Sequence, residues 1–446
     1  MRATSFFVLP FVALAPAAGA TAVAKTRAAS QRVSYDGFKV LRVPVSHANL
    51  HAVNSAIDDL GLSTWQDSRK PGRFADVVVP PAQATAFAER LGSIDTATTE
   101  TTMMMHDDLG AAIAEEMKYG AYEAGSLNDT WFHTFHPYED HLQFLHDLQA
   151  LYPNNSEIVT SGTSLDGRTI TGIRMFGRSS SSSSNKTRPK AVVFHGTVHA
   201  REWIATMVVE YLAYQLLHGY HAGTASGVND TSGFLDTYDI YAFPIVNPDG
   251  FVYTQTTDRL WRKNRQTTSN SSCVGRDINR NWPIAWAAGG GSSEDPCAPD
   301  YRGGAQADAP ETAALTTWLH GVQQAQGIKL YIDYHSYGQL FMTPYGYTCE
   351  AAPARSKALL ALADGAAAAI YDVHGVYFQS GSICSMLYKS TGNSVDYVHD
   401  VIGAENAFTS ELRDMGQTGF VLPPAQILPS CEESYAGVQY LLQTMD

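Results

Sequence analysis

Positive charge is scarce in this sequence. The 446 residues contain 30 lysines and arginines against 44 aspartates and glutamates, which gives a formal net charge of −14. Outside residues 259–280 the chain has no lysine- or arginine-rich cluster of the kind that binds phosphate groups. Proteins that bind nucleic acids or anionic membranes carry such clusters. We therefore expect neither as a partner.

Long hydrophobic runs are also scarce. One begins the chain, where Met1-Arg2 precedes "FFVLPFVALAPAA" and the run ends at Ala18-Gly19-Ala20, a small-x-small pattern. This arrangement predicts a signal peptide over residues 1–20 and a secreted protein that begins near Thr21. No other run approaches the roughly 20 residues that span a bilayer, so we expect no membrane anchor.

Cysteine is absent from the N-terminal half. In an exported chain the five cysteines predict disulfides with one thiol left over; they are Cys273, Cys297, Cys349, Cys384 and Cys431. N-glycosylation sequons are likewise absent before residue 120, and their presence after it indicates a glycoprotein from a eukaryotic source. They lie at Asn128, Asn154, Asn185, Asn229 and Asn270.

The length of the chain exceeds what one hydrophobic core supports, so two folding units are expected. In residues 32–118 the runs "FKVLRVPV" and "FADVVVP" alternate as strands, and each is followed by a helical pattern. A further helix is expected to end at Lys118. We interpret residues 21–118 as a propeptide, made of a small α+β activation domain and a connecting helix, with Lys118 as the site of an activating protease.

From residue 119 to 446 strands alternate with longer helices, which predicts an α/β domain whose sheet is covered on both faces. A site is expected outside the carboxyl ends of the strands. The sequence shows no internal repeat, and a serine run at 179–184 is expected to be a flexible surface insertion. Strands are predicted at 170–176, 191–196, 238–246, 329–335 and 406–413, and helices at 138–151, 203–218, 309–325 and 355–374.

Three residues at predicted strand ends form a candidate metal site. His199 and Glu202 follow the strand "AVVFHG" at a spacing that brings both side chains to one point, and His335 ends the strand "YIDYH". Two histidines and a carboxylate suit a catalytic zinc that keeps an open position. His195 offers a rival pair with His199, but its place inside the strand favours a buried, hydrogen-bonded histidine. The loop histidines are expected at the surface; they are His133, His136, His218 and His221.

Two further features fit such a centre. Glu411, in "FTSELRD", is a candidate general base that deprotonates a zinc-bound water, although a salt bridge to Arg413 is the alternative. Residues 259–280 concentrate arginines, whose planar forks match a carboxylate, although a solvated loop is the alternative here. Asp277 in the same segment is a candidate hydrogen-bond partner for a ligand histidine.

From about residue 130 to 446 the chain resembles the zinc metallocarboxypeptidases of the carboxypeptidase A type, the funnelin-like family of secreted proenzymes. The resemblance rests on motifs in family order: "HAREW", "NPDG", "LWRKNR", "INRNW", "YHSYGQL", "PYGY", "GNSVDY" and "ELRD". It implies a mixed parallel and antiparallel central sheet flanked by helices, preceded by a small antiparallel α+β sandwich propeptide. It also implies a monomer, with one Zn²⁺ per chain and peptide or protein C-termini as substrates.

The resemblance also assigns roles to individual residues. It makes His199, Glu202 and His335 the zinc ligands, with Glu411 as the general base. Arg262 matches the arginine that stabilises the tetrahedral oxyanion. The residues that match the grip on the substrate's terminal carboxylate are Asn279, Arg280 and Tyr388, and those that match neighbouring subsites are Arg201, Ser336, Tyr337 and Phe420.

The specificity pocket is implied in the same way. Relatives that remove Lys or Arg carry an aspartate where this chain has Val395, so an apolar floor and a preference for aromatic or large aliphatic C-terminal residues are expected. Leu387, Ile383 and Met342 fit this apolar pocket, and Asp396 is expected to be structural. The alternatives are a broad or basic-residue carboxypeptidase and a non-catalytic binding module on the same fold.

The resemblance also implies which cysteines form disulfides. Cys273 and Cys297 match the family's common disulfide, and Cys349 and Cys384 fall where some relatives carry a second one. Cys431 is then the free thiol.

Overall fold

The computed structural model describes residue 1 and residues 32–66, 71–177, 188–226, 233–269 and 271–445. Residues 2–20 of the predicted signal peptide, the serine run and three of the sequons lie outside these described residues; those sequons are Asn185, Asn229 and Asn270.

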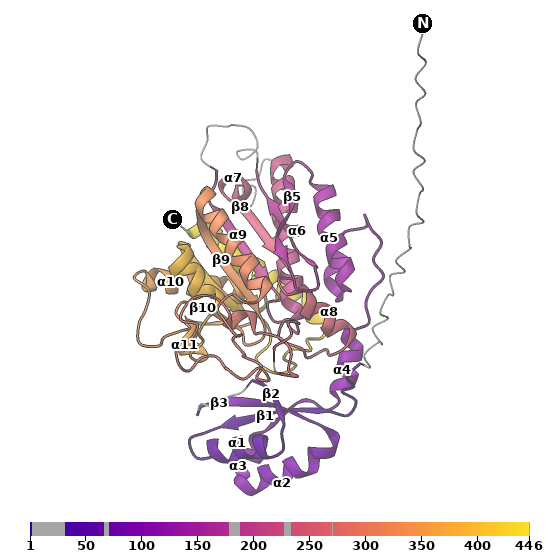
Figure 1. Cartoon of the computed structure of the whole chain (residues 1–446), viewed down its shortest axis with the longest axis vertical. Helices are drawn as coiled ribbons and strands as arrows, with labels where there is room; N and C mark the ends of the chain where they lie inside the picture. Colours follow the sequence, from indigo (N-terminus) through magenta and orange to yellow (C-terminus); the bar gives the residue numbers. More distant parts are fainter. Residues whose placement is uncertain (2–31, 67–70, 178–187, 227–232, 270, 446) are drawn as a thin grey trace. The chain divides into compact units, whose positions relative to one another are not determined.

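A small antiparallel sheet with helices is formed by the N-terminal described residues (Figure 1). Its strand order is β2-β3-β1-β4. Alternating valines of the two central strands, such as Val43 and Val77, pack in one cluster with Phe87 and Leu91 of a covering helix. The strands are β1 (Lys39–Val45), β2 (Ser63–Gln66), β3 (Arg73–Val79) and β4 (Met103–His106), and the helices are α1 (Leu50–Asp59), α2 (Ala84–Ile94), α3 (Thr96–Thr101) and α4 (Leu109–Glu116).

The larger sheet has eight strands within the described ranges, in the order β11-β10-β12-β9-β7-β8-β6-β5. Its centre is parallel, because β12, β9, β7 and β8 pair in the same direction. Antiparallel pairs join β10 to β12 and extend the other edge through β6 and β5. The strands are β5 (Ser156–Thr163), β6 (Thr169–Met175), β7 (Ala191–Gly196), β8 (Asp239–Phe243), β9 (Ile328–His335), β10 (Leu340–Thr343), β11 (Gln379–Ser382) and β12 (Asn406–Glu411).

Helices cover both faces of this sheet, as Figure 1 shows. Side chains of a strand alternate between the faces, so Val192 and Phe194 of β7 join one core and Ala191 and Val193 join the other. The first core contains residues of α5 (Tyr138–Leu151), α6 (Trp203–Ser226), α10 (Ser356–His374) and α13 (Ile427–Thr444), and the second contains residues of α9 (Pro310–Gln326) and α12 (Ser394–Tyr397). The remaining helices are α7 (Phe234–Thr237), α8 (Pro248–Thr256) and α11 (Ile383–Met386).

The architecture confirms the expected mixed sheet between helices and the small antiparallel sheet before it. Some predicted bounds and one predicted exposure are wrong. The helix predicted at 203–218 continues to Ser226, and the strand predicted at 238–246 ends at Phe243. Helix α4 ends at Glu116 rather than Lys118. His136 is buried rather than at the surface, because its ring stacks on Trp131 at 3.5 Å and its Nε2 is 2.8 Å from that residue's carbonyl oxygen. His195 is buried and hydrogen-bonded to Tyr331, as expected.

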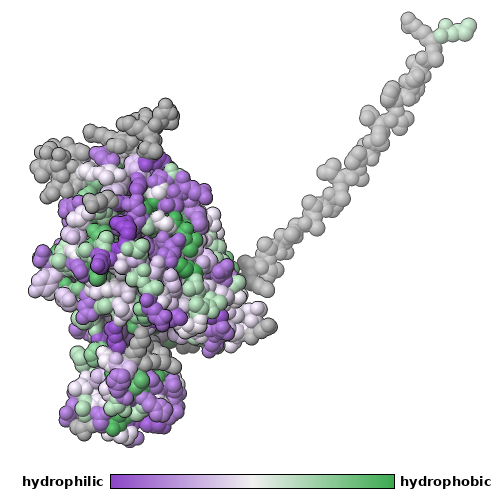
Figure 2. Space-filling view, turned by 90° about the vertical axis from the view of Figure 1, so that its left-hand side faces the viewer, coloured by the Kyte–Doolittle hydropathy of each residue, from purple (hydrophilic) through white to green (hydrophobic). Residues whose placement is uncertain are grey.

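The surface in Figure 2 mixes hydrophilic residues with small groups of hydrophobic ones. Within the described residues, no helix is long and apolar enough to cross a membrane.

Candidate active site and metal centre

The ends of three parallel strands bring the site together. His335 is the last residue of β9 and Glu411 the last residue of β12, and the register of these strands places the two residues side by side. Strand β7 ends at Gly196, where a Cβ would lie 2.9 Å from the carbonyl oxygens of Ala205 and Pro244. The close approach that glycine permits holds the strand end against α6.

A tight turn then delivers the first two metal-binding candidates. Thr197 has a φ of 56°, a left-handed conformation that is rare for a β-branched residue, and its hydroxyl contacts Thr206 at 2.6 Å. The amide of Glu202 donates to the carbonyl oxygen of His199, so the two side chains emerge on the same side just before α6 begins.

His199, Glu202 and His335 form the group of potential metal ligands found among the described residues, and their ligand atoms lie within 4.8 Å of one another. Nδ1 of His199 is 2.9 Å from Oε1 of Glu202, and Nδ1 of His335 is 3.0 Å from Oε2. The two Nδ1 atoms are 3.1 Å apart. Ligand atoms about 2.0–2.1 Å from a tetrahedral zinc are themselves roughly 3.3 Å apart, so this donor set fits Zn²⁺.

Each histidine of this group is backed by a buried carboxylate. Nε2 of His199 is 3.1 Å from Asp277, and Nε2 of His335 is 3.2 Å from Asp333. Such contacts fix the ring orientation and leave the other nitrogen to bind metal. Asp277 was predicted from the sequence as such a partner, whereas Asp333 was not. The spacing of Asp333 and His335 on β9 could have indicated this contact, because residues two apart in a strand have side chains on the same face.

Glu411 lies beside this group with an unused oxygen. Its Oε2 is buried and has no hydrogen-bond partner among the described residues. Burial raises the pKa of Glu411 to about 8, which a bound cation would lower again. The salt bridge to Arg413 does not form, because Arg413 pairs with Glu433 instead.

Two arginines of the 259–280 segment, Arg262 and Arg280, reach the same cavity, whereas Arg276 pairs with Asp308. Arg262 donates to Asp277 at 2.7 Å, and Nη1 of Arg262 is 3.9 Å from Glu202. Arg280 is buried, and its Nη2 is 3.3 Å from the hydroxyl of the exposed Tyr388. Nε of Arg280 has no hydrogen-bond partner within the described chain. A buried guanidinium with a free donor suits an anionic ligand.

A cavity of about 830 Å³ connects these side chains. Its remaining candidate residues include Ser336, whose buried Oγ also lacks a partner among the described residues. The pKa of Arg201 is lowered to about 10, mainly by burial and to a smaller extent by the charge of Arg262. The residues predicted from the sequence that line the cavity are His199, Arg201, Glu202, Arg262, Asn279, Arg280, His335, Ser336, Tyr337, Ile383, Leu387, Tyr388, Glu411 and Phe420.

The N-terminal sheet contributes to the same cavity, which the sequence analysis did not assign to individual residues. Thr64, Trp65, Gln66 and Arg73 line it. The indole of Trp65 packs edge-to-face on Phe420 at 5.4 Å.

The buried carboxylate of Asp76 adds a second contact between the small N-terminal sheet and the side chains that line the cavity. Asp76 accepts from the Tyr337 hydroxyl and from two nitrogens of Arg42 at 2.7 Å. These residues therefore cover the side chains expected to meet a substrate.

The apolar residues expected in the specificity pocket divide into two groups. Ile383 and Leu387 line the cavity, whereas Val395 and Met342 pack in the buried cluster that contains Ile383 and are not among the lining side chains. Asp396 accepts hydrogen bonds from the amides of Gly346 and Tyr347, as a structural residue does.

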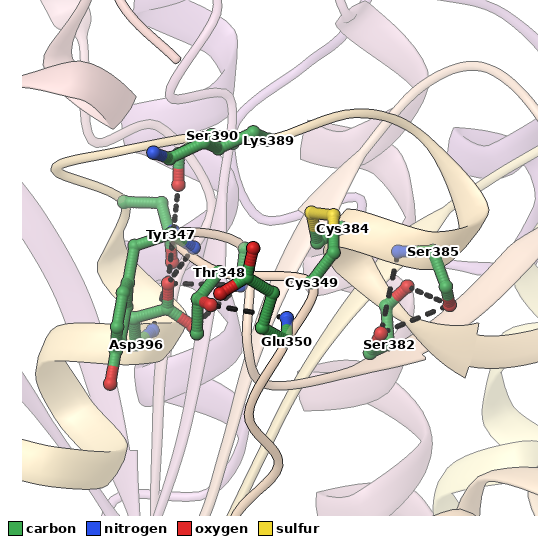
Figure 3. The surroundings of a disulfide bond; sticks show 12 residues. Tyr347, Thr348, Cys349, Glu350, Ser382, Cys384, Ser385, Lys389, Ser390 and Asp396 are labelled. Carbon is green, nitrogen blue, oxygen red and sulfur yellow. Dashed lines mark hydrogen bonds between the residues drawn. A yellow bond between two sulfur atoms is a disulfide. The ribbon is translucent and has the colours of Figure 1, made fainter. Parts of the chain in front are cut away.

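Two disulfides are present, Cys273–Cys297 and Cys349–Cys384, and Cys431 is free and buried. Figure 3 shows that Cys349–Cys384 joins the loop at Tyr347 to the start of α11, close to Lys389 and Ser390. It therefore tethers the segment that carries Tyr388.

Comparisons with known proteins agree with this geometry. Residues 141–437 match the family model described as zinc carboxypeptidase, and residues 42–116 match the model described as carboxypeptidase activation peptide. A metallocarboxypeptidase A-like protein of Trichophyton verrucosum is 45% identical over 422 residues, which cover 93% of this chain and 95% of the relative.

Two solved structures are similar in fold. Thrombin activatable fibrinolysis inhibitor has a TM-score of 0.82 at 23% identity, covering 92% of this chain and 99% of its own. The carboxypeptidase A of Helicoverpa armigera has a TM-score of 0.74 at 25% identity, covering 91% of this chain and 97% of its own.

Proposed function

The chain belongs to the zinc carboxypeptidase family and is a proenzyme with an activation peptide, and from this premise we propose that it is a secreted enzyme that removes aromatic and large aliphatic C-terminal residues. The convergence of His199, Glu202 and His335 beside Glu411 is the observation that carries the proposal.

One zinc ion per chain is held by His199, Glu202 and His335 in this proposal. The fit of their donor atoms to a tetrahedral site supports it, as do the carboxylates behind each histidine. Zinc supplies a Lewis acid and lowers the pKa of a water in its open position toward about 7.

Two residues act on the reacting groups. Glu411 accepts the proton of the attacking water on its free Oε2 and later returns it to the departing amine. Arg262 donates to the oxyanion that forms on the scissile carbonyl, a contribution of about 3–4 kcal/mol in a site closed to water. The Asp277 carboxylate holds this guanidinium in place.

Arg280, Asn279 and Tyr388 recognise the terminal carboxylate. The free Nε of Arg280 supports this assignment, and so does the exposed Tyr388 beside it, which is placed to fold over a bound residue. The substrate chain upstream runs past Arg201, Ser336, Tyr337 and Phe420, which line the same cavity.

Specificity for apolar residues follows from the surroundings of the side-chain pocket. Val395 lies in the apolar cluster beneath it, with Met342 and Ile383. A Lys or Arg side chain entering there would find no counter-charge from Val395, which costs several kcal/mol for a buried cation.

Activation requires cleavage after Lys118 in the proposed layout of signal peptide 1–20, propeptide 21–118 and catalytic domain 119–446. Lys118 is the single lysine or arginine between residues 91 and 167, and its side chain is exposed. Secretion, glycosylation and a monomeric state complete the proposal.

The experiment compares blocked dipeptides that end in Phe, Lys or Phe-amide, before and after limited trypsin treatment and with a chelator control. We expect rapid, chelator-sensitive cleavage of the Phe acid that rises after trypsin. Preferred cleavage of the Lys substrate would replace the specificity assignment, and equal cleavage of the amide would refute the role of Arg280. No cleavage after confirmed processing would favour a non-catalytic binding module.

A further inference from the structure

We propose that Ser394 is a positioning residue, which joins the support of the zinc ligand His335 to Asn279, one of the residues proposed to bind the terminal carboxylate. This inference rests on the proposed function. It adds to the site a residue that neither lines the cavity nor binds the metal. Ser394 is fully buried and begins α12, one position before Val395.

The hydroxyl of Ser394 donates to the carboxylate that backs a zinc ligand. It donates to Oδ2 of Asp333, the same oxygen that lies 3.2 Å from Nε2 of His335. One carboxylate oxygen therefore receives both the serine and the ligand histidine. A hydrogen bond to an ionised carboxylate is roughly twice as strong as one between neutral groups, so this contact fixes the oxygen that orients His335.

Asp333 has few other contacts. Its side chain is buried, and its Oδ1 has no hydrogen-bond partner among the described residues. Asp277, which backs His199, is held in addition by Arg262 and by the amide of Asn279. A buried carboxylate needs donors to offset the loss of water. Without the hydroxyl of Ser394, the carboxylate of Asp333 would keep His335 as its single polar contact within the described chain.

The backbone of Ser394 contacts the other part of the site. Its amide donates to Oδ1 of Asn279 at 2.9 Å, which fixes the orientation of that side-chain amide. Ser394 thus contacts the support of a zinc ligand through its hydroxyl and a carboxylate-binding residue through its backbone. The separation of zinc and carboxylate grip decides which peptide bond reaches the metal, so a rigid link between their supports serves cleavage of the last bond.

The test compares Ser394→Ala with Ser430→Ala in the whole proenzyme. Alanine at 394 removes the hydroxyl and keeps the amide that holds Asn279. Ser430 is also buried, but its hydroxyl donates to the carbonyl oxygen of Gln426 and it does not line the cavity. The measured quantity is the dissociation constant of Zn²⁺, obtained by competition with a chelator of known affinity, which requires neither processing nor activity.

We expect Ser394→Ala to raise the zinc dissociation constant about fivefold, less than the roughly 10–100-fold typical of a direct partner of a ligand histidine. Ser430→Ala should leave it unchanged. In an Asp333→Asn background the effect of Ser394→Ala should shrink to about twofold or less, because a neutral amide accepts a weaker hydrogen bond. A serine that only stabilises the fold would have the same effect in both backgrounds.

Activity provides a second readout after trypsin treatment of the same proteins. At saturating zinc, Ser394→Ala should lower kcat for the blocked dipeptide ending in Phe by about fivefold with little change in KM, because His335 is less well oriented. The preference for this substrate over the one ending in Phe-amide should remain, because Arg280 is untouched.

A wild-type zinc dissociation constant in Ser394→Ala would overturn the inference, and so would an equally large effect in the Asp333→Asn background. Where Ser394→Ala does not fold, Ser394→Cys decides the matter, because it has a similar volume and a weak donor: a raised dissociation constant supports the inference, and a wild-type one overturns it. Failure of the proposed function looks different, because the wild-type proenzyme would then bind no zinc or would cleave nothing after trypsin.

Discussion

Removing the charge of Asp277 should weaken metal binding and disturb Arg262 together. This buried carboxylate accepts from Nε2 of His199 at 3.1 Å, from Nη2 of Arg262 at 2.7 Å and from the amide of Asn279 at 2.9 Å. Burial alone would raise the pKa of Asp277, but the charges of Arg262 and His199 hold it well below its usual range. These contacts therefore favour the ionised form of the carboxylate.

The substitution Asp277→Asn keeps the shape and removes the charge. Loss of the carboxylate behind a ligand histidine typically costs 10–100-fold in metal affinity, or ~1.4–2.7 kcal/mol. The amide of the new side chain also places donors where Arg262 needs an acceptor, so kcat should fall further than metal loss explains, even at saturating zinc.

The assay is competition for zinc against a chelator of known affinity, followed by kcat/KM at saturating zinc. The control is Asp239→Asn, because Asp239 is also buried and paired with an arginine, Arg174 at 2.6 Å, but lies at the start of β8, away from the site. Asp239→Asn should lose stability without losing zinc affinity. Unchanged zinc affinity in Asp277→Asn would refute the assignment of His199 as a ligand.

Three further predictions follow from individual contacts. Arg280→Gln should lower kcat/KM for the blocked dipeptide ending in Phe by about a hundredfold, since a lost buried charge pair costs ~2–5 kcal/mol. It should also abolish the preference for this substrate over the one ending in Phe-amide. A retained preference would contradict the role of Arg280 in binding the terminal carboxylate. Glu116→Gln should speed tryptic cleavage at Lys118 several-fold, because breaking its buried ion pair with Arg259 costs ~3–5 kcal/mol and leaves that arginine without its counter-charge. The cleavage rate is followed on gels. An unchanged rate would show that this ion pair does not hold the segment around Lys118 in place. Burial, and after it the charge of His141, lowers the pKa of His136 to about 3, so the folded protein favours the neutral ring. The contribution of His136 to the free energy of unfolding is therefore complete above pH ~6.5 and falls by ~1.4 kcal/mol per pH unit below it. In urea unfolding, His136→Gln should flatten the acid side of the stability profile, and an unaltered slope would count against this reasoning.

Elements with a continuous or periodic apolar pattern were predictable from the sequence. Strand β7 falls where "AVVFHG" predicts it, because all six residues are buried, and α5 matches its predicted range for a similar reason. The short strands β2 and β11, "STWQ" and "QSGS", carry no such pattern. They exist because a neighbouring strand supplies hydrogen-bond partners, which no local sequence reveals.

The residues of the site also differ in how far the sequence predicts them. Residues at strand ends were predictable, because parallel strands bring their carboxyl ends to one edge. The pairing of Glu116 with Arg259, 143 positions apart, was not, since only the tertiary fold joins α4 to that segment. The burial of His136 was missed because its stacking on Trp131 leaves no periodic signal in a loop sequence.

Every proposed role in catalysis depends on a zinc ion at His199, Glu202 and His335, and a zinc titration measures this dependence. The chain cleaved at Lys118 is stripped of metal and titrated with Zn²⁺, while hydrolysis of the blocked dipeptide ending in Phe is followed. We predict no activity without metal and a linear return of activity that stops at one zinc per chain. Activity in the stripped protein, or a return that requires more than one zinc, would contradict the assignment of His199, Glu202 and His335 as a single catalytic centre.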